Sequence, residues 1–344
     1  MSPGAFRFLL ATIVVASHFT SANIGVAAVY LFFALSGYWV SEMWSKKYSA
    51  TRSPYITYIV SRVWRIAPVF LLCSMLALFL LLRAPSIVVP AIPFDPIEPN
   101  SIIPSFILLG YSALHAGPLG PAWSLDVEMQ FYIIAPILIA AFSRRPALTS
   151  LTVIALALVS AAIWKARSIG FASPFFLAGI ACARIPALRP RPAIAKASAA
   201  LFFLALGLFA IVPALRPVMF TGAHPGPLSA FNPALNVLLG ALALPFALHT
   251  VSRHGSNFDR LLSDWSYSLY LFHWIPLVFV QHYLPGINQH GHLVRGLLTV
   301  PVLALTSAIS LAITIWLDRP LDSLRAEFVR RRGLNRVTVA AETA

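Results

Sequence analysis

One arginine and one histidine interrupt the first apolar segment of the chain. Arg7 and His18 are the charged or titratable side chains between residues 4 and 19, a stretch that is otherwise almost entirely apolar. In a helix, the step from Arg7 to His18 is about three turns, so both side chains lie on one face, separated by about 16 Å of rise. Ionisable groups inside an apolar helix mark functional sites, and histidine is a common general base near neutral pH. The spacing therefore predicts a base and a cation on one helix face.

A carboxylate is expected at a similar depth on another helix. Of the acidic residues, Glu128 alone is predicted well inside an apolar segment, about 8 Å below the outer membrane boundary. An unpaired carboxylate there is costly, so it requires a partner or a water-filled cavity. We expect His18 to be that partner. The alternative is a structural ion pair or a protonated glutamic acid.

Two arginines three positions apart precede the third apolar segment. Arg62 and Arg65 point the same way on a helix, and their planar guanidinium groups match the geometry of phosphate. Taken without other motifs, this pair is only a weak signal for phosphate binding. The alternative is that Arg62 and Arg65 contact lipid headgroups and set the orientation of the chain in the membrane, as arginines beside membrane segments usually do.

A polar stripe follows in a later apolar segment. Ser266, Tyr270 and His273 stand at i, i+4 and i+7, on one face of a helix near mid-membrane. Hydrogen bonding between helices explains such a stripe. Tyr270 and His273, with Ser36 and Trp123, are nevertheless candidates for contacting a substrate or stabilising an oxyanion.

Composition indicates which kind of protein must position these residues. The chain has 344 residues, of which 59% are hydrophobic and only 10% charged, against about 25% charged in soluble domains. The net charge is +14, and the basic residues fall between the apolar segments. Membrane topology explains this distribution better than nucleic-acid binding does. Cys73 and Cys182 lie in apolar segments, and no His/Cys cluster has metal-ligand spacing. We therefore expect an all-α polytopic membrane protein without a metal site.

Ten segments are long enough to cross a bilayer. They are Ala5–Ala22, Ile24–Met43, Ile66–Leu82, Ala122–Phe142, Leu148–Trp164, Ile169–Ile185, Ala197–Ala214, Asn232–Thr250, Leu261–Tyr283 and Gly296–Leu317. With both termini in the cytoplasm, most of the 25 Lys and Arg residues fall on the cytoplasmic side. A further crossing at Ser101–Tyr111 would invert the later segments, so residues 101–116 are predicted to be re-entrant or interfacial.

Five motifs in register resemble the acyltransferase 3 family of integral membrane O-acyltransferases. They run from Arg7 to about Pro320 and comprise Arg7-x10-His18, residues 31–38 (LFFALSGY), Arg62-x-x-Arg65, residues 123–132 (WSLDVEMQFY) and residues 266–273 (SYSLYLFH). The sequence departs from the family pattern at Asp318-Arg319-Pro320, where a glutamate is expected before the proline.

The resemblance implies a ten-helix enzyme of the cytoplasmic (inner) membrane that carries no permanently bound cofactor. Its donor would be cytoplasmic acyl-coenzyme A, often acetyl-coenzyme A, and its acceptor a hydroxyl of a surface polysaccharide or another extracytoplasmic or lipid-linked glycan. His18 matches the essential histidine, as base or transient acyl carrier, and Arg7 its partner arginine. Arg62 and Arg65 match the motif thought to hold coenzyme A, and Glu128 the glutamate of the pattern.

Residues 1–320 are predicted to form the transmembrane acyltransferase domain, and residues 321–344 a basic cytoplasmic tail. Membrane lipids are the expected surroundings, and no nucleic acid is expected as a partner. The competing interpretation is a proton-coupled transporter or exporter of a polar metabolite, in which buried Arg, His and Glu form a proton relay.

Overall fold

The computed structural model describes residues 1–83, 102–114, 117–163, 167–220, 226–253, 255–283 and 292–333, and no side chain of residues 281–296, 298 and 299. Within these ranges the chain is almost entirely helical. The longer helices are α1 (Pro3–Phe19), α2 (Gly25–Lys46), α3 (Pro54–Arg83), α6 (Ala122–Arg144), α7 (Pro146–Ala162), α8 (Ile169–Arg184), α9 (Pro192–Ile211), α11 (Asn232–Thr250), α12 (Asn257–Phe272), α13 (Trp274–Tyr283), α14 (His292–Ile313) and α15 (Arg319–Arg331).

Within the described residues, six helical stretches are long and apolar enough to cross a membrane. They are Gly25–Ala50, Pro54–Arg83, Ala122–Arg144, Pro192–Ile211, Pro227–Thr250 and Val300–Arg331, and α1, α7 and α8 are shorter apolar helices. Each of the ten predicted segments is helical over most of its length. The chain is therefore an all-α polytopic membrane protein, as expected, and the count of ten spans stays a prediction.

The predicted segment Leu261–Tyr283 is two helices rather than one. α12 ends at Phe272 and α13 begins at Trp274, with His273 at the turn between them. Pro276 explains the break, because it has no N–H to donate to the Phe272 carbonyl and its ring crowds that carbonyl. The break therefore places His273 between two helix ends inside an apolar segment.

The segment around residues 101–116 contains only short elements in the structure. A four-residue helix, α5 (Pro104–Ile107), is followed by a single tight turn at Tyr111–Ala113. Four helical residues rise about 6 Å, far less than a membrane crossing requires. Whether this segment is re-entrant or interfacial stays a prediction.

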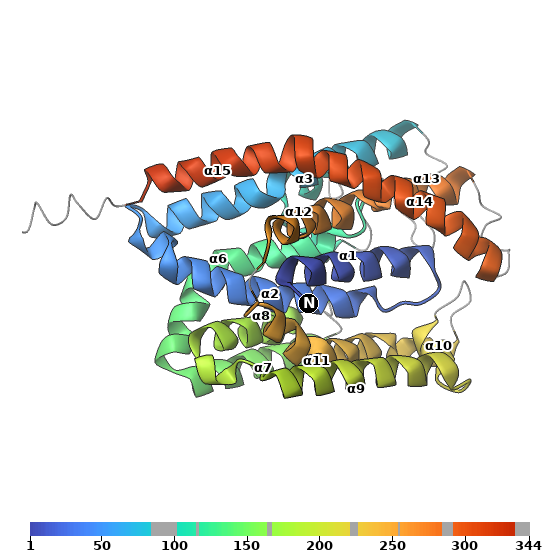
Figure 1. Cartoon of the computed structure of the whole chain (residues 1–344), viewed down its shortest axis with the longest axis horizontal. Helices are drawn as coiled ribbons and strands as arrows, with labels where there is room; N and C mark the ends of the chain where they lie inside the picture. Colours follow the sequence, from blue (N-terminus) through green and yellow to red (C-terminus); the bar gives the residue numbers. More distant parts are fainter. Residues whose placement is uncertain are drawn as a thin grey trace, which may run out of the picture.

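Two groups of helices flank a central layer (Figure 1). α1 packs against α2 and α12 in the middle of the molecule, α3 and α15 run side by side along one flank, and α7, α9 and α11 lie along the other. α2 and α8 approach most closely at two glycines: a Cβ atom on Gly179 would lie 2.0 Å from the Ala34 carbonyl oxygen, and one on Gly37 2.1 Å from that of Phe176. Small residues permit such backbone contact between membrane helices.

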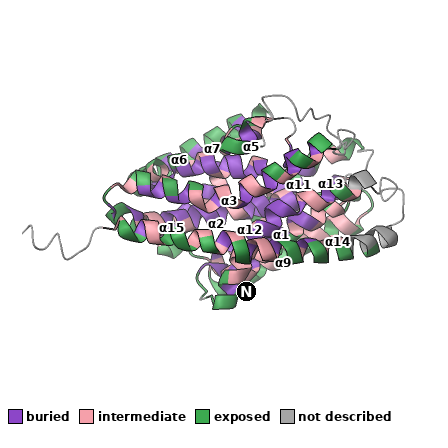
Figure 2. Ribbon diagram, turned by 90° about the horizontal axis from the view of Figure 1, so that it is seen from above, coloured by how far each residue is buried: buried purple, intermediate pink, exposed green. Residues whose placement is uncertain are grey.

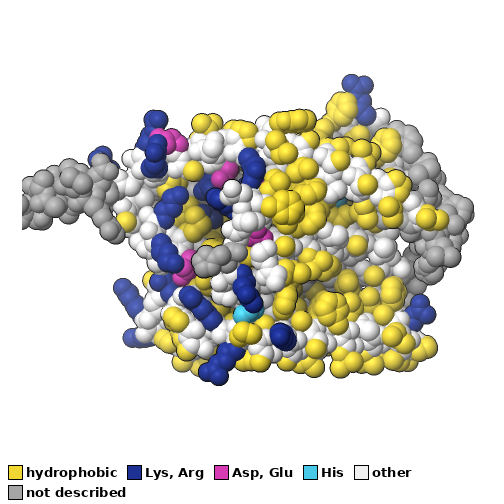
Figure 3. All heavy atoms as spheres, in the orientation of Figure 1, with side chains coloured by type: hydrophobic (Ala, Val, Ile, Leu, Met, Phe, Trp, Pro, Cys, Tyr) yellow, Lys and Arg dark blue, Asp and Glu magenta, His cyan; other side chains and the backbone are white. Residues whose placement is uncertain are grey.

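The surface divides into an apolar part and a basic end. Buried residues concentrate in the interior of the bundle (Figure 2), whereas large apolar side chains of α9 such as Phe203, Leu204 and Ile211 are exposed. Most of the Lys and Arg side chains on the face shown in Figure 3 gather at its left end, and apolar side chains predominate over the middle of that face. Exposed apolar helices are expected where lipid is the solvent.

The predicted boundary at residue 320 falls near the start of α15. This helix begins at Arg319 and packs along α3, where Arg325 Nη1 donates to Ser61 Oγ at 2.8 Å. Residues 321–331 of the predicted tail thus contribute to the helical bundle. Residues 334–344 lie outside the described residues.

Candidate functional site

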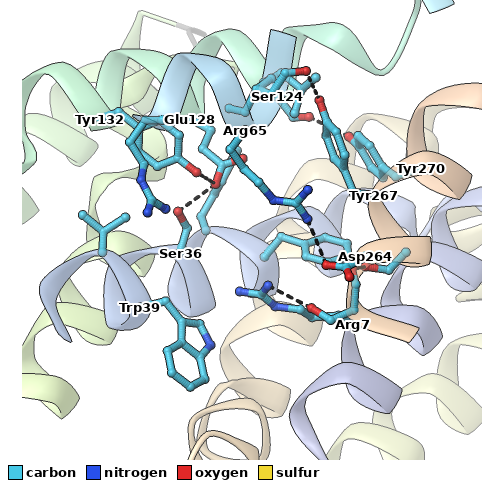
Figure 4. Close-up of a pocket in the computed structure, with 18 of the residues that line it drawn as sticks. Arg7, Ser36, Trp39, Arg65, Ser124, Glu128, Tyr132, Asp264, Tyr267 and Tyr270 are labelled. Carbon is cyan, nitrogen blue, oxygen red and sulfur yellow. Dashed lines mark hydrogen bonds and ion pairs between the residues drawn. The ribbon is translucent and has the colours of Figure 1, made fainter. Parts of the chain in front are cut away.

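A polar cavity of about 330 Å³ lies among α1, α2, α3, α6, α12 and α15. Arg7 and Glu128 point into it from different helices, as does Arg65 (Figure 4). Its other polar lining residues are Ser36, Arg62, Ser124, Tyr132, Ser263, Asp264, Ser266, Tyr267, Tyr270, Asp322 and Arg325. The structure therefore brings six predicted site residues to one cavity: Arg7, Ser36, Arg62, Arg65, Glu128 and Tyr270.

Glu128 is supported by hydroxyl groups. Its Oε1 atom accepts hydrogen bonds from Ser36 Oγ at 2.7 Å and from the Tyr132 hydroxyl at 2.6 Å. Both donors stabilise a carboxylate that sits within an apolar helix. The expected hydrogen bond between Glu128 and His18 is absent from the part of the chain that the structure describes, and His18 does not line the cavity.

α6 carries a second acid close to Glu128. Asp126, two positions earlier on α6, is fully buried. Its carboxylate accepts from the backbone N–H of Ser112 at 2.7 Å and from Gln130 Nε2 at 2.9 Å. Asp126 thus ties α6 to the short turn that precedes it and is absent from the lining of the cavity.

Arg62 is a buried cation surrounded by tyrosines. Its side chain is 8% exposed, and Nη2 donates to the Tyr48 hydroxyl at 2.7 Å. The guanidinium carbon lies 5.4, 5.9 and 5.8 Å from the ring centres of Tyr48, Tyr58 and Tyr132. Aromatic faces stabilise a cation but leave its charge uncompensated. No carboxylate pairs with Arg62 among the described residues, and its Nε is buried without a partner.

Arg65 lines the same cavity with a different set of partners. Its Nη1 lies 2.9 and 2.8 Å from the two carboxylate oxygens of Asp318, and its Nη2 lies 3.4 Å from Asp264 Oδ1. Asp322 is 4.0 Å from its Nε. Three aspartates from α12, α15 and the turn before α15 therefore compensate the charge of Arg65, which distinguishes it from Arg62.

Arg7 reaches the cavity from the first turns of α1. Its Nη1 donates to Ser263 Oγ at 3.3 Å, and its Nε is buried without a partner among the described residues. The start of α1 is held by Asp259, whose carboxylate accepts from Gly4 N at 3.1 Å, from Ala5 N at 2.9 Å and from Ser2 Oγ. Burial raises the pKa of Asp259, but these hydrogen bonds and the charge of Arg7 outweigh it and lower the pKa below its ordinary value.

His18 lies at the opposite end of α1 from Arg7. Its side chain is exposed, and its ring centre lies 5.3 Å from that of His273 and 5.5 Å from that of Trp274. Tyr270 connects this group to the cavity, because it lines the cavity and its ring centre is 6.3 Å from that of His273. The structure therefore brings His18 together with His273.

Tyr270 and Trp123, two predicted substrate residues, contact different parts of the bundle. The Tyr270 hydroxyl and Ser124 Oγ are 2.6 Å apart, which joins α12 to α6. Trp123 lies under the guanidinium group of Arg167, with 5.5 Å between the guanidinium carbon and the ring centre. Arg167 lies between α7 and α8, so this contact joins the start of α6 to the α7–α8 connection.

Several site residues were not predicted from the sequence, namely Tyr132, Asp264, Asp318, Asp322 and Arg325. A spacing signal existed for three of them. Asp318, Asp322 and Arg325 stand at i, i+4 and i+7, which places them on one helix face. Because the tail is basic overall, its sequence did not suggest a helix face that packs on the bundle. The contact of α15 with α3 shows what this face packs against.

Comparison with protein-family models matches residues 3–319 to an acyltransferase domain, that of the acyltransferase 3 family. The match covers nearly the whole chain. No curated protein matches the chain, and no solved structure matches it.

Proposed function

The chain belongs to the acyltransferase 3 family, and on this premise we propose that it is a membrane O-acyltransferase that moves an acyl group, in particular acetyl, from cytoplasmic acyl-coenzyme A to a hydroxyl of an extracytoplasmic or lipid-linked glycan. The observation that supports this proposal best is the cavity in which Arg7 and Arg62 have no carboxylate partner among the described residues. Such cations suit the phosphates of a coenzyme A donor.

The two arginines of the Arg-x-x-Arg motif have different roles in this proposal. Arg62 binds a phosphate directly, since neutral tyrosines surround it and no carboxylate among the described residues pairs with its charge. Arg65 adds positive charge to the wall, while Asp318 and Asp264 hold its guanidinium group in place. Arg7 is a second phosphate ligand from α1, because Ser263 is its one hydrogen-bond partner among the described residues.

The acyl transfer is proposed to occur near His18. His18 takes the proton of the acceptor hydroxyl as its oxygen attacks the thioester carbonyl. The carbon–sulfur bond then breaks, and the coenzyme A thiolate leaves with the proton from His18, so that an ester and a thiol are formed. Ser36, Trp123 and Tyr270 remain candidates for stabilising the oxyanion, and Glu128 supports the cavity through Ser36 and Tyr132.

Thiol release tests this function. Purified protein in detergent or nanodiscs is given acetyl-coenzyme A with and without a glycan acceptor, and free coenzyme A is measured. We expect release by the wild type that is lost in the His18→Ala and His18→Gln variants at equal membrane levels. Retained release in either variant overturns the role of His18. A protein that moves a solute but frees no thiol is instead the proton-coupled transporter.

A further inference from the structure

His273 occupies the break between α12 and α13 with an incomplete set of hydrogen bonds. Its side chain is fully buried, and Nδ1 lies 3.3 Å from the Leu269 carbonyl oxygen. Nε2 is buried and has no partner among the described residues. Buried polar atoms are normally paired, and an exception calls for an explanation.

The partner of Nδ1 determines where the proton of this imidazole lies. A carbonyl oxygen accepts hydrogen bonds and cannot donate, so Nδ1 carries the hydrogen and donates it to Leu269. Nε2 of neutral His273 therefore carries a lone pair. The unpaired atom is an acceptor, and the ligand it lacks is an N–H or O–H group.

The ring that faces His273 is His18. Their ring centres are 5.3 Å apart and their planes are inclined by 31°. Two imidazoles joined edge to edge by an N–H···N hydrogen bond have ring centres about 5 Å apart. The separation of the His18 and His273 rings therefore matches that of a hydrogen-bonded pair. Catalytic hydrogen bonds are often longer in structures without substrate and shorten when it binds.

Neighbouring residues hold this geometry. Trp274 contacts the His18 ring edge to face at 5.5 Å between ring centres, and its Nε1 donates to the Pro118 carbonyl at 3.0 Å. The last turn of α12 holds the backbone of His273, whose N–H donates to the Leu269 carbonyl oxygen at 3.2 Å. Glu128 makes no hydrogen bond to His18 among the described residues, whereas the His273 ring lies beside that of His18.

We propose that His273 is the positioning residue for His18: His273 Nε2 accepts the N–H of His18 and thereby keeps the other His18 nitrogen unprotonated and directed at the acceptor hydroxyl. This inference rests on the proposed acyl transfer. In the reaction, the hydroxyl proton moves to that free nitrogen and later to the leaving thiolate. His273 keeps its own proton on Nδ1 throughout, so it acts through His18 and does not touch the substrate.

Two substitutions separate this role from packing. His273→Gln retains an acceptor near the position of Nε2, whereas His273→Leu fills a similar volume without one. We expect His273→Leu to lower kcat at least about 100-fold with little change in KM for acetyl-coenzyme A. His273→Gln should recover most of this loss. Equal activity of the two variants, or a loss confined to KM, overturns the proposal.

A matched control is available on α11. His249 also has Nδ1 against a backbone carbonyl, that of Pro190 at 2.9 Å, and it does not line the cavity. His249→Leu should therefore transfer acyl groups at the wild-type rate. If it loses as much activity as His273→Leu, the effect reports general packing and the proposal fails.

A second readout does not depend on turnover. Histidine labelled with ¹⁵N in the purified protein shows which ring nitrogen carries the proton. We expect His18 to populate one neutral tautomer in the wild type and a mixture in His273→Leu, with the signal assigned by its loss in His18→Gln. An unchanged His18 spectrum overturns the inference. Failure of the wild type to release thiol overturns the proposed function instead, and the spectrum still decides the pairing.

Discussion

Arg65 Nη1 lies 2.9 and 2.8 Å from the two carboxylate oxygens of Asp318, and the Asp318 side chain is 4% exposed. Asp318 ends a π-helical turn, Thr314–Asp318, that connects α14 to α15. Such turns insert an extra residue into a helix and often occur at functional sites. The turn thus directs the carboxylate of Asp318 at Arg65, the second arginine of the Arg-x-x-Arg motif.

Removing this carboxylate should destabilise the fold. Breaking a fully buried ion pair costs about 3–5 kcal/mol, but Arg65 keeps Asp264 as a partner and its side chain is 23% exposed. We therefore expect Asp318→Asn to lower the free energy of unfolding by about 1–3 kcal/mol, and Asp318→Glu to lower it less. Thermal unfolding in detergent measures both.

The control for this substitution is Glu327 on α15. Glu327 forms ion pairs with Arg330 and Arg331 at the surface, where such pairs contribute little. Glu327→Gln should unfold at the wild-type temperature. An Asp318→Asn variant as stable as the wild type would show that the pair with Arg65 does not hold α15 in place.

Arg62 and Arg65 should respond differently when coenzyme A binding is measured. Hydrogen bonds to a charged group contribute about 1.5–3 kcal/mol, so Arg62→Gln should raise the Kd for coenzyme A about 10- to 150-fold. Arg65→Gln should change the Kd less and the unfolding temperature more, because aspartates occupy its donors. Titration of purified protein by calorimetry, followed by thermal unfolding, gives both quantities. The reverse order of effects would contradict the division of roles.

The sequence was sufficient to locate helices but not their interruptions. α11 runs from Asn232 to Thr250, as predicted, because an apolar run ends at both sides in polar residues. The predicted segment Leu261–Tyr283 continued through His273, since hydropathy averages over a window and hides the effect of Pro276. Hydropathy likewise did not predict the π-helical turn that ends at Asp318.

Pairing within the site depends on how each helix is rotated about its axis. Periodicity placed Arg7 and His18 on α1 and gave their separation along it, and depth alone suggested Glu128 as the partner of His18. The structure instead directs Glu128 to Ser36 and Tyr132, and His18 to His273. Depth is readable from a sequence because rise per residue is constant, whereas rotation is set by packing with other helices.

Contact between α2 and α8 yields a prediction with an internal control. A Cβ atom on Gly179 would lie 2.0 Å from the Ala34 carbonyl oxygen, so Gly179→Ala must push two backbones apart. We expect a loss of about 1–3 kcal/mol in the free energy of unfolding. Gly207 on α9 has no atom within 4 Å of a Cβ, so Gly207→Ala should be neutral or slightly stabilising. Equal unfolding temperatures for the two variants would show that α2 and α8 are not in backbone contact.

Asp259 gives the start of α1 a defined dependence on pH. A carboxylate that accepts the first backbone N–H groups of a helix stabilises it, typically by about 1 kcal/mol. The pKa of Asp259 is below its ordinary value of 3.8, so its contribution is complete above about pH 5 and disappears as the pH falls through the lowered pKa. Asp259→Asn should therefore be less stable than the wild type at pH 7, and the difference should shrink as the pH falls below about 4. Unfolding midpoints in detergent from pH 7 to pH 3 measure it. Ser2→Ala, which removes one donor, should give an intermediate profile; parallel curves for wild type and Asp259→Asn would show that the charge of this residue does not hold α1.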